Sequence, residues 1–382
     1  MRKPPLYALG LVVAALVALG LVVLFSASEV RGLRFYGDPL YFVKRQAVYV
    51  AAGIVIAAAA AAIDYRVWRD TPLLAWLLGG AVFAALLAVF LFPAIKGSHR
   101  WIVLGPVSFQ PGEFAKVATA VMVAVWLDRA AWRVELFMRG AFWPAAIVAS
   151  TALPVMFEPD FGSVMVIGAT GFLLMFAAGV RILHMLPFLA GGLALAGWKI
   201  FHNANRMARI FAFAGLSPDG TASAAAAPAG YQSDMSLVAI GRGGLFGVGL
   251  GRSMQKQNYL PEAWTDFIFA VGAEELGLVF SIGTVALFAA FFALSTYVAL
   301  KAADRFGRLL ATGMAFIVFF QAVFNLGVVC EAVPTKGMAL PFFSYGGTNM
   351  LVSFFAAGTI LSVGIHSLED RKKALVRKAA AG

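Results

Sequence analysis

The chain has 382 residues, of which 61% are hydrophobic and 13% are charged, and its formal net charge is +11. A soluble protein of this size cannot bury so much apolar surface, so the composition excludes an ordinary soluble globular protein and indicates a membrane protein. No basic stretch is interleaved with aromatic residues, which argues against nucleic-acid binding. The single cysteine, Cys330, excludes an intramolecular disulfide, and its apolar neighbours favour a packed thiol.

About ten apolar runs approach the ~20 residues that a helix needs to cross a bilayer. The first, residues 6–25, is longer than the ~7–15-residue apolar core of a signal peptide, so we interpret it as an uncleaved span. Residues 267–300 are too many for one upright helix, which is expected to tilt or to begin in the interface. The sequence predicts an all-α, multi-pass membrane protein with spans at 6–25, 46–63, 72–95, 114–127, 141–156, 163–180, 185–201, 267–300, 309–330 and 350–366.

An even number of spans places both termini on one side, and the positive-inside rule assigns the more basic loops to the cytoplasm. Loops on the side of the termini carry Arg66, Arg69, Arg129, Arg133, Arg139, Arg181, Lys301, Arg305 and Arg308. The first outer loop breaks the rule with Arg31, Arg34, Lys44 and Arg45. We expect one membrane domain over residues 1–366, with a large outer loop at 204–265 that contains an Ala/Pro-rich stretch at 215–230, and a basic cytoplasmic tail at 367–382.

The outer segment 96–116 reads KGSHRWIVLGPVSFQPGEFAK. Pro111 suits the first turn of a helix, and Glu113 and Lys116 lie one turn apart, where they can form an ion pair. The second interpretation is a cationic rim for an anionic substrate, formed by Lys96, His99, Arg100 and Lys116. Trp101 suits an anchor at the membrane interface. The residues alone leave both interpretations open.

Two further outer segments contain acids or glycines. Residues 157–163 read FEPDFGS, in which Pro159 and Asp160 can begin a helix, or Glu158 and Asp160 can hold Mg²⁺ together with a substrate phosphate. The glycine-rich segment 231–251 matches neither the phosphate-loop pattern nor the dinucleotide fingerprint, so we expect no nucleotide. Its glycines predict a tight loop whose backbone closely approaches a ligand or another helix.

Residues 259–277 read YLPEAWTDFIFAVGAEELG, a loop that becomes an apolar helix. Thr265 is expected to cap the helix and Asp266 to lie in its first turn, where the helix dipole favours an anion. Helical spacing places Glu274 within a quarter turn of Asp266 and turns Glu275 the opposite way. Such acids either stabilise the helix or act as a general base or proton carrier.

The last outer segment, 331–350, reads EAVPTKGMALPFFSYGGTNM. Two prolines and three glycines in it predict a shaped, re-entrant loop beside the final span. Lys336 is either part of a turn-rich connection or a ligand for a phosphate or carboxylate.

Taken in this order, these segments resemble the SEDS family of bacterial cell-wall proteins over nearly the whole chain. The resemblance rests on SHRWIVLGPVSFQPGEFAK, EPDFG, YQSDMSLVAIGRGGLFGVGLG, YLPEAWTDFIFAVGAEELG and PTKGMALPFFSYGG. Residues 255–263 and 334–342 are more similar to the division branch of the family than to its elongation branch. Three residues depart from the family's usual pattern: Trp264 replaces a histidine, Glu158 a glutamine and Gly112 a serine.

The resemblance implies the SEDS fold and a peptidoglycan glycosyltransferase that polymerises lipid II into β-1,4-linked glycan strands at the outer face of the cytoplasmic membrane. The division branch implies work at the septum, and an elongation polymerase with the same chemistry is the alternative. The implied partners are a class B penicillin-binding protein, which is a transpeptidase, and other membrane proteins of the division or elongation machinery.

The resemblance also implies residue roles. Asp266 matches the family's essential aspartate, and we expect it to deprotonate the acceptor sugar hydroxyl. The residues expected to bind substrate are Arg100, Trp101, Glu113, Lys116, Lys336 and Ser344. A divalent cation, Mg²⁺ or Mn²⁺, at Glu158 and Asp160 is a candidate helper for the leaving pyrophosphate.

Two functions of other classes compete with this one: a lipid II flippase, and a scaffold that only activates its penicillin-binding partner. A transporter needs polar groups along a path through the membrane. The ionisable residues of this chain gather at the outer edges of the spans instead, which favours an enzyme.

Overall fold

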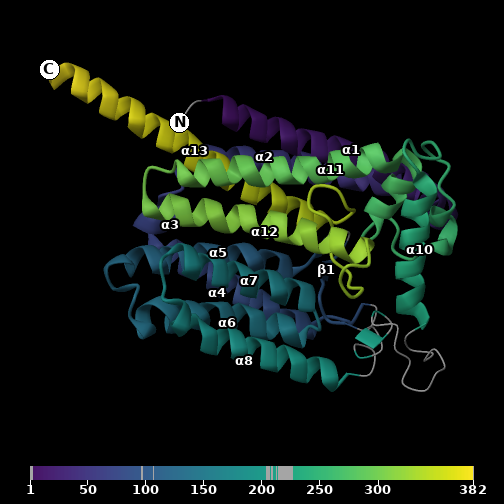
Figure 1. Ribbon diagram of the computed structural model, residues 1–382, viewed down its shortest axis with the longest axis horizontal. Helices are drawn as coiled ribbons and strands as arrows, with labels where there is room; N and C mark the ends of the chain where they lie inside the picture. Colours follow the sequence, from purple (N-terminus) through teal and green to yellow (C-terminus); the bar gives the residue numbers. More distant parts are fainter. Residues whose placement is uncertain are drawn as a thin grey trace.

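The computed structural model describes residues 3–95, 98–105, 107–203, 207, 210, 211, 213 and 227–381. Its long helices run side by side as one bundle (Figure 1). The α-helices are α1 (Pro4–Tyr36), α2 (Tyr41–Ala62), α3 (Val67–Asp70), α4 (Pro72–Ala88), α5 (Pro111–Arg129), α6 (Trp143–Phe157), α7 (Phe161–Ala177), α8 (Ile182–Phe201), α10 (Ala227–Gly243), α11 (Ile268–Leu300), α12 (Arg305–Val329) and α13 (Gly347–Ala381). Of these, α3 is a single short turn, and α10 lies across one end of the bundle. Shorter elements are η1 (Val89–Leu91), η2 (Ala131–Arg133), η3 (Phe137–Phe142), η4 (Gln255–Tyr259), β1 (Ile102–Leu104) and β2 (Val107–Phe109).

Each of the predicted spans coincides with a helix, so the all-α, multi-pass architecture is confirmed. Among the described residues, eight helices are long and apolar enough to cross a membrane, and α7 is a shorter apolar helix of 17 residues. The predicted span 114–127 lies in α5, whose side chains are almost all buried among α4, α6, α7, α12 and α13. Because α5 faces other helices rather than lipid, it can carry polar side chains within the bundle.

The two termini lie at the same end of the bundle, together with α3, whereas α10 and β1 lie at the other end (Figure 1). This arrangement confirms the even number of crossings. We call the first the termini end and the second the outer end, following the positive-inside rule. Cys330 follows α12 at the outer end and is exposed, so the predicted packed thiol is wrong. Its apolar neighbours belong to the helix, but the cysteine itself lies beyond the last helical residue.

The long run 267–300 is not one straight helix, because α11 is kinked at Gly277 (φ 75°, ψ −164°). Its tilt, or a start in the membrane interface, stays a prediction. A Cβ atom at Gly277 would lie 2.4 Å from the backbone nitrogen of Gly247, which is too close for a side chain. Only glycine adopts this backbone conformation without strain. The kink therefore separates a short first segment of α11, at the outer end, from the membrane-spanning remainder.

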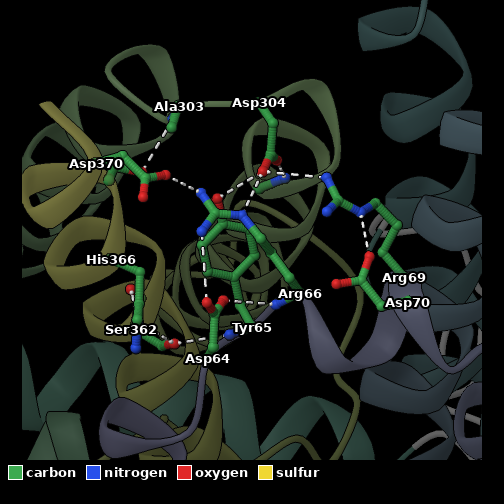
Figure 2. A network of polar contacts seen from close by, with 12 residues as sticks. Asp64, Tyr65, Arg66, Arg69, Asp70, Ala303, Asp304, Ser362, His366 and Asp370 are labelled. Atoms are coloured by element: carbon green, nitrogen blue, oxygen red, sulfur yellow. Dashed lines mark hydrogen bonds and ion pairs between the residues drawn. The ribbon is translucent and has the colours of Figure 1, made fainter. Parts of the chain in front are cut away.

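A polar network closes the termini end (Figure 2). The guanidinium of Arg66 contacts Asp64 at 3.4 Å, Asp304 at 2.9 Å and Asp370 at 2.5 Å. Tyr65 donates its hydroxyl to Asp304 at 2.9 Å. Burial alone would raise the pKa of Asp304, but hydrogen bonds from the Gly307 N–H and Arg66 lower it below its usual range. The network thus joins the α2–α3 connection, the start of α12 and the end of α13.

A candidate active site at the outer end

Asp266 lies in a turn just before α11, and Ile268 is the first helical residue. The predicted cap is wrong, because Thr265 donates its hydroxyl to the backbone oxygen of Glu262 at 3.2 Å, and no side chain accepts a capping hydrogen bond from α11 within the described residues. Phe267 occupies the capping position. The carboxylate of Asp266 is therefore carried by a turn that must be held by other elements.

Three hydrogen bonds hold that turn in place. Asn325 of α12 donates its amide to the backbone oxygen of Asp266 at 2.8 Å. Ser344 donates its hydroxyl to the backbone oxygen of Thr265 at 2.6 Å, and the N–H of Tyr345 donates to the backbone oxygen of Trp264 at 3.1 Å. All three bonds are accepted by backbone oxygens of the turn, so they position the carboxylate of Asp266 without engaging its own oxygen atoms.

The segment 331–346 runs into the bundle as the predicted re-entrant loop. Phe342 and Phe343 are buried, and a Cβ atom on Gly20, halfway along α1, would lie 2.8 Å from the Cα atom of Phe343. Ser344 is also buried and links this loop to the Asp266 turn, while its role in substrate binding stays a prediction. The loop therefore supports the turn from inside the molecule.

Gly337 makes room for the Asp266 side chain. A Cβ atom at Gly337 would lie 2.5 Å from Oδ2 of Asp266, so a larger residue would displace the carboxylate. The residue that precedes Gly337 in the loop is Lys336, whose Nζ lies 3.6 Å from Oδ1 of Asp160 at the start of α7. One short loop thus brings a carboxylate, a lysine and a second carboxylate into one region.

Glu113 and Lys116 form the predicted ion pair, with Nζ of Lys116 2.6 Å from Oε1 of Glu113. Both residues are buried, so Lys116 lies inside the bundle and not on a cationic rim. Lys116 also donates to Oε1 of Gln321 at 2.8 Å, and Gln321 donates to the backbone oxygen of Ala339 at 2.8 Å. The pair therefore connects α5 through α12 to the loop that positions Asp266.

Asp160 begins α7 as predicted. Its carboxylate accepts hydrogen bonds from the hydroxyl of Ser163 at 2.8 Å and from the amide of Gln110 at 3.2 Å. Burial alone would raise the pKa of Asp160, but the positive charges of Lys336 and Arg100 hold it below its usual range. Asp160 is thus a charged carboxylate whose oxygens are already engaged.

Glu158 is buried nearby, and its two carboxylate oxygens accept no hydrogen bond from the described residues. Burial, together with the charge of Asp160, raises the pKa of Glu158 to about 8. Arg100 binds the backbone at this point, donating to the backbone oxygens of Glu158 at 3.1 Å and Pro159 at 2.5 Å. At neutral pH the side chain of Glu158 is therefore predominantly protonated.

These two acids do not fit a divalent cation well. A cation at Asp160 would lie beside the ammonium of Lys336, which is 3.6 Å from Oδ1, and the protonated Glu158 is a poor ligand. Within the described part of the chain, no group of three or more His, Cys, Asp or Glu side chains is placed to hold a metal. We therefore assign no step of the reaction to a metal held by this pair.

The segment before α5 contains an antiparallel hairpin that the sequence analysis did not predict, in which β1 pairs with β2. Each strand has three residues, too few to show a clear alternation of apolar and polar side chains. Trp101 precedes β1 and is partly buried, and His99 contacts the backbone oxygen of Phe92 at 2.8 Å. Lys96, the remaining member of the predicted rim, lies outside the described residues.

Glu274 and Glu275 are fully buried, and because Asp266 lies in the turn before α11, the quarter-turn relation predicted between Asp266 and Glu274 does not apply. Glu274 accepts hydrogen bonds from the hydroxyl of Ser253 and the N–H of Met254, whereas Glu275 accepts from the hydroxyl of Ser26 at 2.6 Å. These carboxylates fasten the glycine-rich loop to α11 and α1. The spacing along the helix did not indicate these partners, which come from distant segments.

Residues 231–243 of the glycine-rich segment form part of α10 instead of the predicted loop, whereas its close approach to another helix, α11, is confirmed. A Cβ atom on Gly247 would lie 2.1 Å from the backbone oxygen of Glu275, and one on Gly243 would lie 2.0 Å from that of Ala273. The large outer loop also contains α10, which packs on α11. Residues 215–226 of the Ala/Pro-rich stretch lie outside the described residues.

Comparisons with known proteins agree on one family. The model of the FtsW/RodA/SpoVE family, described as cell cycle proteins, matches residues 7–369. A protein of Trichlorobacter lovleyi named probable peptidoglycan glycosyltransferase FtsW is 38% identical over 363 residues, which cover 92% of this chain and 91% of that protein. The sequence match therefore extends over almost the whole of both proteins.

Two solved structures share the fold. The rod shape determining protein RodA of Thermus thermophilus is 28% identical with a TM-score of 0.68, covering 94% of this chain and 96% of that one. A chain of a peptidoglycan synthase complex, studied for the coordination of polymerization and crosslinking, is 26% identical with a TM-score of 0.72. That match covers 94% of this chain and 98% of the other.

Proposed function

Because the chain belongs to the FtsW/RodA/SpoVE family of cell cycle proteins, we propose that it polymerises lipid II into peptidoglycan glycan strands, with Asp266 as the catalytic base. The observation that carries this proposal is the placement of Asp266. Its turn is fixed through backbone oxygens by Asn325 and Ser344, and Gly337 leaves space for its carboxylate. A carboxylate held this way at the outer end can receive a proton from a bound hydroxyl.

The reaction is an inverting glycosyl transfer. The Asp266 carboxylate takes the proton from the 4-hydroxyl of the acceptor GlcNAc as that oxygen forms a bond to C1 of the donor sugar. The bond between C1 and the pyrophosphate oxygen breaks, and the polyprenyl pyrophosphate leaves with the electron pair. Attack from the face opposite the leaving group converts the α-linked donor into a β-1,4 bond.

The leaving pyrophosphate already carries negative charge, so it needs cations more than it needs a general acid. Lys336 and Arg100 both place positive charge near Asp160, and Lys336 directly precedes Gly337, whose position faces Asp266. Lys116 is less suited to direct contact, because it is buried against Glu113 and Gln321. Its proposed contribution is to hold the loop that carries Lys336.

The curated relatives named FtsW support the division branch, and we propose work at the septum of the cytoplasmic membrane. An elongation polymerase remains the alternative, since the RodA of Thermus thermophilus shares the fold. The peptidoglycan synthase complex among the structural neighbours supports a partner that crosslinks the product. We propose a class B penicillin-binding protein in that role.

The test uses purified full-length protein, labelled lipid II and the matching penicillin-binding protein with a blocked transpeptidase. Wild type is expected to form long glycan strands on a gel, and Asp266→Ala none. Strand formation by Asp266→Ala would remove the catalytic assignment. The absence of strands from folded wild type, with or without Mg²⁺ or Mn²⁺, would favour the flippase or scaffold instead. Transport of lipid II in proteoliposomes would then separate those two.

A further inference from the structure

The connection between α1 and α2 is basic although it lies at the outer end. Arg31, Arg34, Lys44 and Arg45 all lie in or beside it. The positive-inside rule disfavours such residues on the outer side of a membrane. Two of them are held locally, because Lys44 pairs with Asp38 at 2.7 Å and Arg45 donates to the hydroxyl of Tyr41 at 2.8 Å. Arg31 is placed differently, against the turn that carries Asp266.

Arg31 is attached to the turn that carries Asp266. Its guanidinium carbon lies 4.1 Å from the ring centroid of Trp264 and 5.0 Å from that of Phe35. An arginine over an aromatic face is held by a cation–π interaction. Phe42 packs near the same indole at 6.1 Å between ring centroids, and the backbone oxygen of Trp264 accepts a hydrogen bond from the re-entrant loop. Arg31 is thus held against Trp264, which precedes the proposed base Asp266 by two residues.

The charge of Arg31 is not neutralised by an acid of the described residues. Glu29, the nearest acid along the helix, lies 3.7 Å from Lys256 instead. Ring contacts leave the N–H groups at the edge of a guanidinium available, and that edge matches the oxygens of a phosphate. Trp264 offers a neutral ring at every pH, whereas a histidine there would carry a charge once protonated.

We propose that Arg31, supported by Trp264, is a binding site for the phosphate groups of the polyprenyl-linked substrate. The proposal rests on the proposed function and adds a substrate-binding residue from α1. It explains why a positive charge is placed on the outer side of α1. An anionic phospholipid headgroup has the same phosphate chemistry, so the experiment must distinguish the two sources.

The experiment measures binding of a fluorescent farnesyl pyrophosphate analogue to the full-length protein in phosphatidylcholine nanodiscs. Arg31→Ala is expected to weaken binding about tenfold, the loss of one charged contact. Arg31→Lys keeps the charge but loses the planar fork, and about a threefold loss is expected. Arg34→Ala is the matched control, because Arg34 lies at the same helix end and faces Phe35 at 5.8 Å. It should bind as wild type does.

Trp264→Leu tests the support given by the indole. It should weaken binding as Arg31→Ala does, and the double variant should be no worse than either single one, because both remove the same contact. Additive losses would contradict this coupling. Size-exclusion profiles and thermal unfolding check that each variant is folded.

Nanodiscs that contain phosphatidylglycerol identify the source of the phosphate. If phosphatidylglycerol removes the difference between wild type and Arg31→Ala, Arg31 binds bilayer lipid and the proposal is overturned. Equal binding by wild type and Arg31→Ala, or no binding by wild type, also overturns it. Because binding is measured without turnover, an inactive wild type that binds through Arg31 would contradict the proposed function and leave this site standing.

Discussion

The two ends of the bundle use charged residues differently. At the termini end, Arg66 is surrounded by three aspartates and Tyr65, and its ion pairs join distant segments of the chain (Figure 2). At the outer end, the Asp266 turn is held through its backbone oxygens, and Arg31 rests on rings rather than on an acid. The termini end therefore uses charge to join segments, whereas the outer end holds the Asp266 turn and Arg31 through uncharged groups.

The largest effect on stability is expected where the outer end has a compensated pair. Lys116→Ala leaves the buried Glu113 without its partner and should lower the free energy of unfolding by about 3–5 kcal/mol. Chemical unfolding in detergent measures the change. The double variant Glu113→Gln/Lys116→Met removes both charges and should recover most of the loss. A loss below ~1 kcal/mol in Lys116→Ala would show that the pair is not structural.

Gly337→Ala should damage catalysis without damaging the fold. The new methyl group would meet Oδ2 of Asp266, so kcat is expected to fall about a hundredfold while binding of lipid II changes little. Gly346→Ala is the matched control in the same loop, because its added Cβ atom would lie 3.8 Å from Cβ of Asn349, an ordinary contact distance. Equal rates for the two variants would show that Gly337 does not position Asp266.

Glu158 should make the protein less stable as the pH rises. Burial raises the pKa of Glu158 to about 8 in the folded protein. Between pH ~5 and 8 the carboxyl is therefore ionised in the unfolded state but still protonated in the folded state, which favours unfolding as the pH rises. Stability should fall over that range, by up to about 1.4 kcal/mol per pH unit, and level off above pH 8. Glu158→Gln should remove this slope, as measured by thermal unfolding at several pH values. An unchanged slope would contradict the assignment.

The termini end should respond more weakly. Arg66→Ala removes the three ion pairs of a partly exposed network and should cost about 1–2 kcal/mol of stability. Because the pKa of Asp304 is lowered in the folded state, its contribution is present above pH ~4 and is lost as the pH falls further. Arg308→Ala, on the exposed face of α12, is the control. Chemical unfolding in detergent measures the stability of both variants. Neither folded variant should lose glycan polymerisation at saturating lipid II.

Much of the fold was predictable because it depends on local patterns. Apolar runs located the helices, Pro111 marked the first turn of α5, and the three-residue spacing of Glu113 and Lys116 gave their ion pair. The kink at Gly277 was not predictable, since glycine is common within apolar helices and the kink depends on contact with Gly247, 30 residues earlier. Such contacts exist only after the chain has folded.

The same distinction applies to the site. The sequence resemblance identified Asp266, but nothing local indicated that Asn325, near the end of the apolar helix α12, would hold its backbone. Neither did any spacing connect Arg31 with Trp264, which are separated by more than half of the chain. The partners of Glu274 were not predictable either, because helical spacing gives a direction but not the segment that lies there.

The most direct test of the account compares Asp266→Asn with Asp234→Asn, an exposed aspartate on α10 at the same end. Single-turnover polymerisation of labelled lipid II would be followed for each protein with its transpeptidase-blocked partner. The account predicts that Asp266→Asn, which keeps the shape but cannot take a proton, is slower than wild type by at least about a hundredfold. Asp234→Asn should match wild type. Wild-type rates from folded Asp266→Asn would contradict the claim that Asp266 is the base.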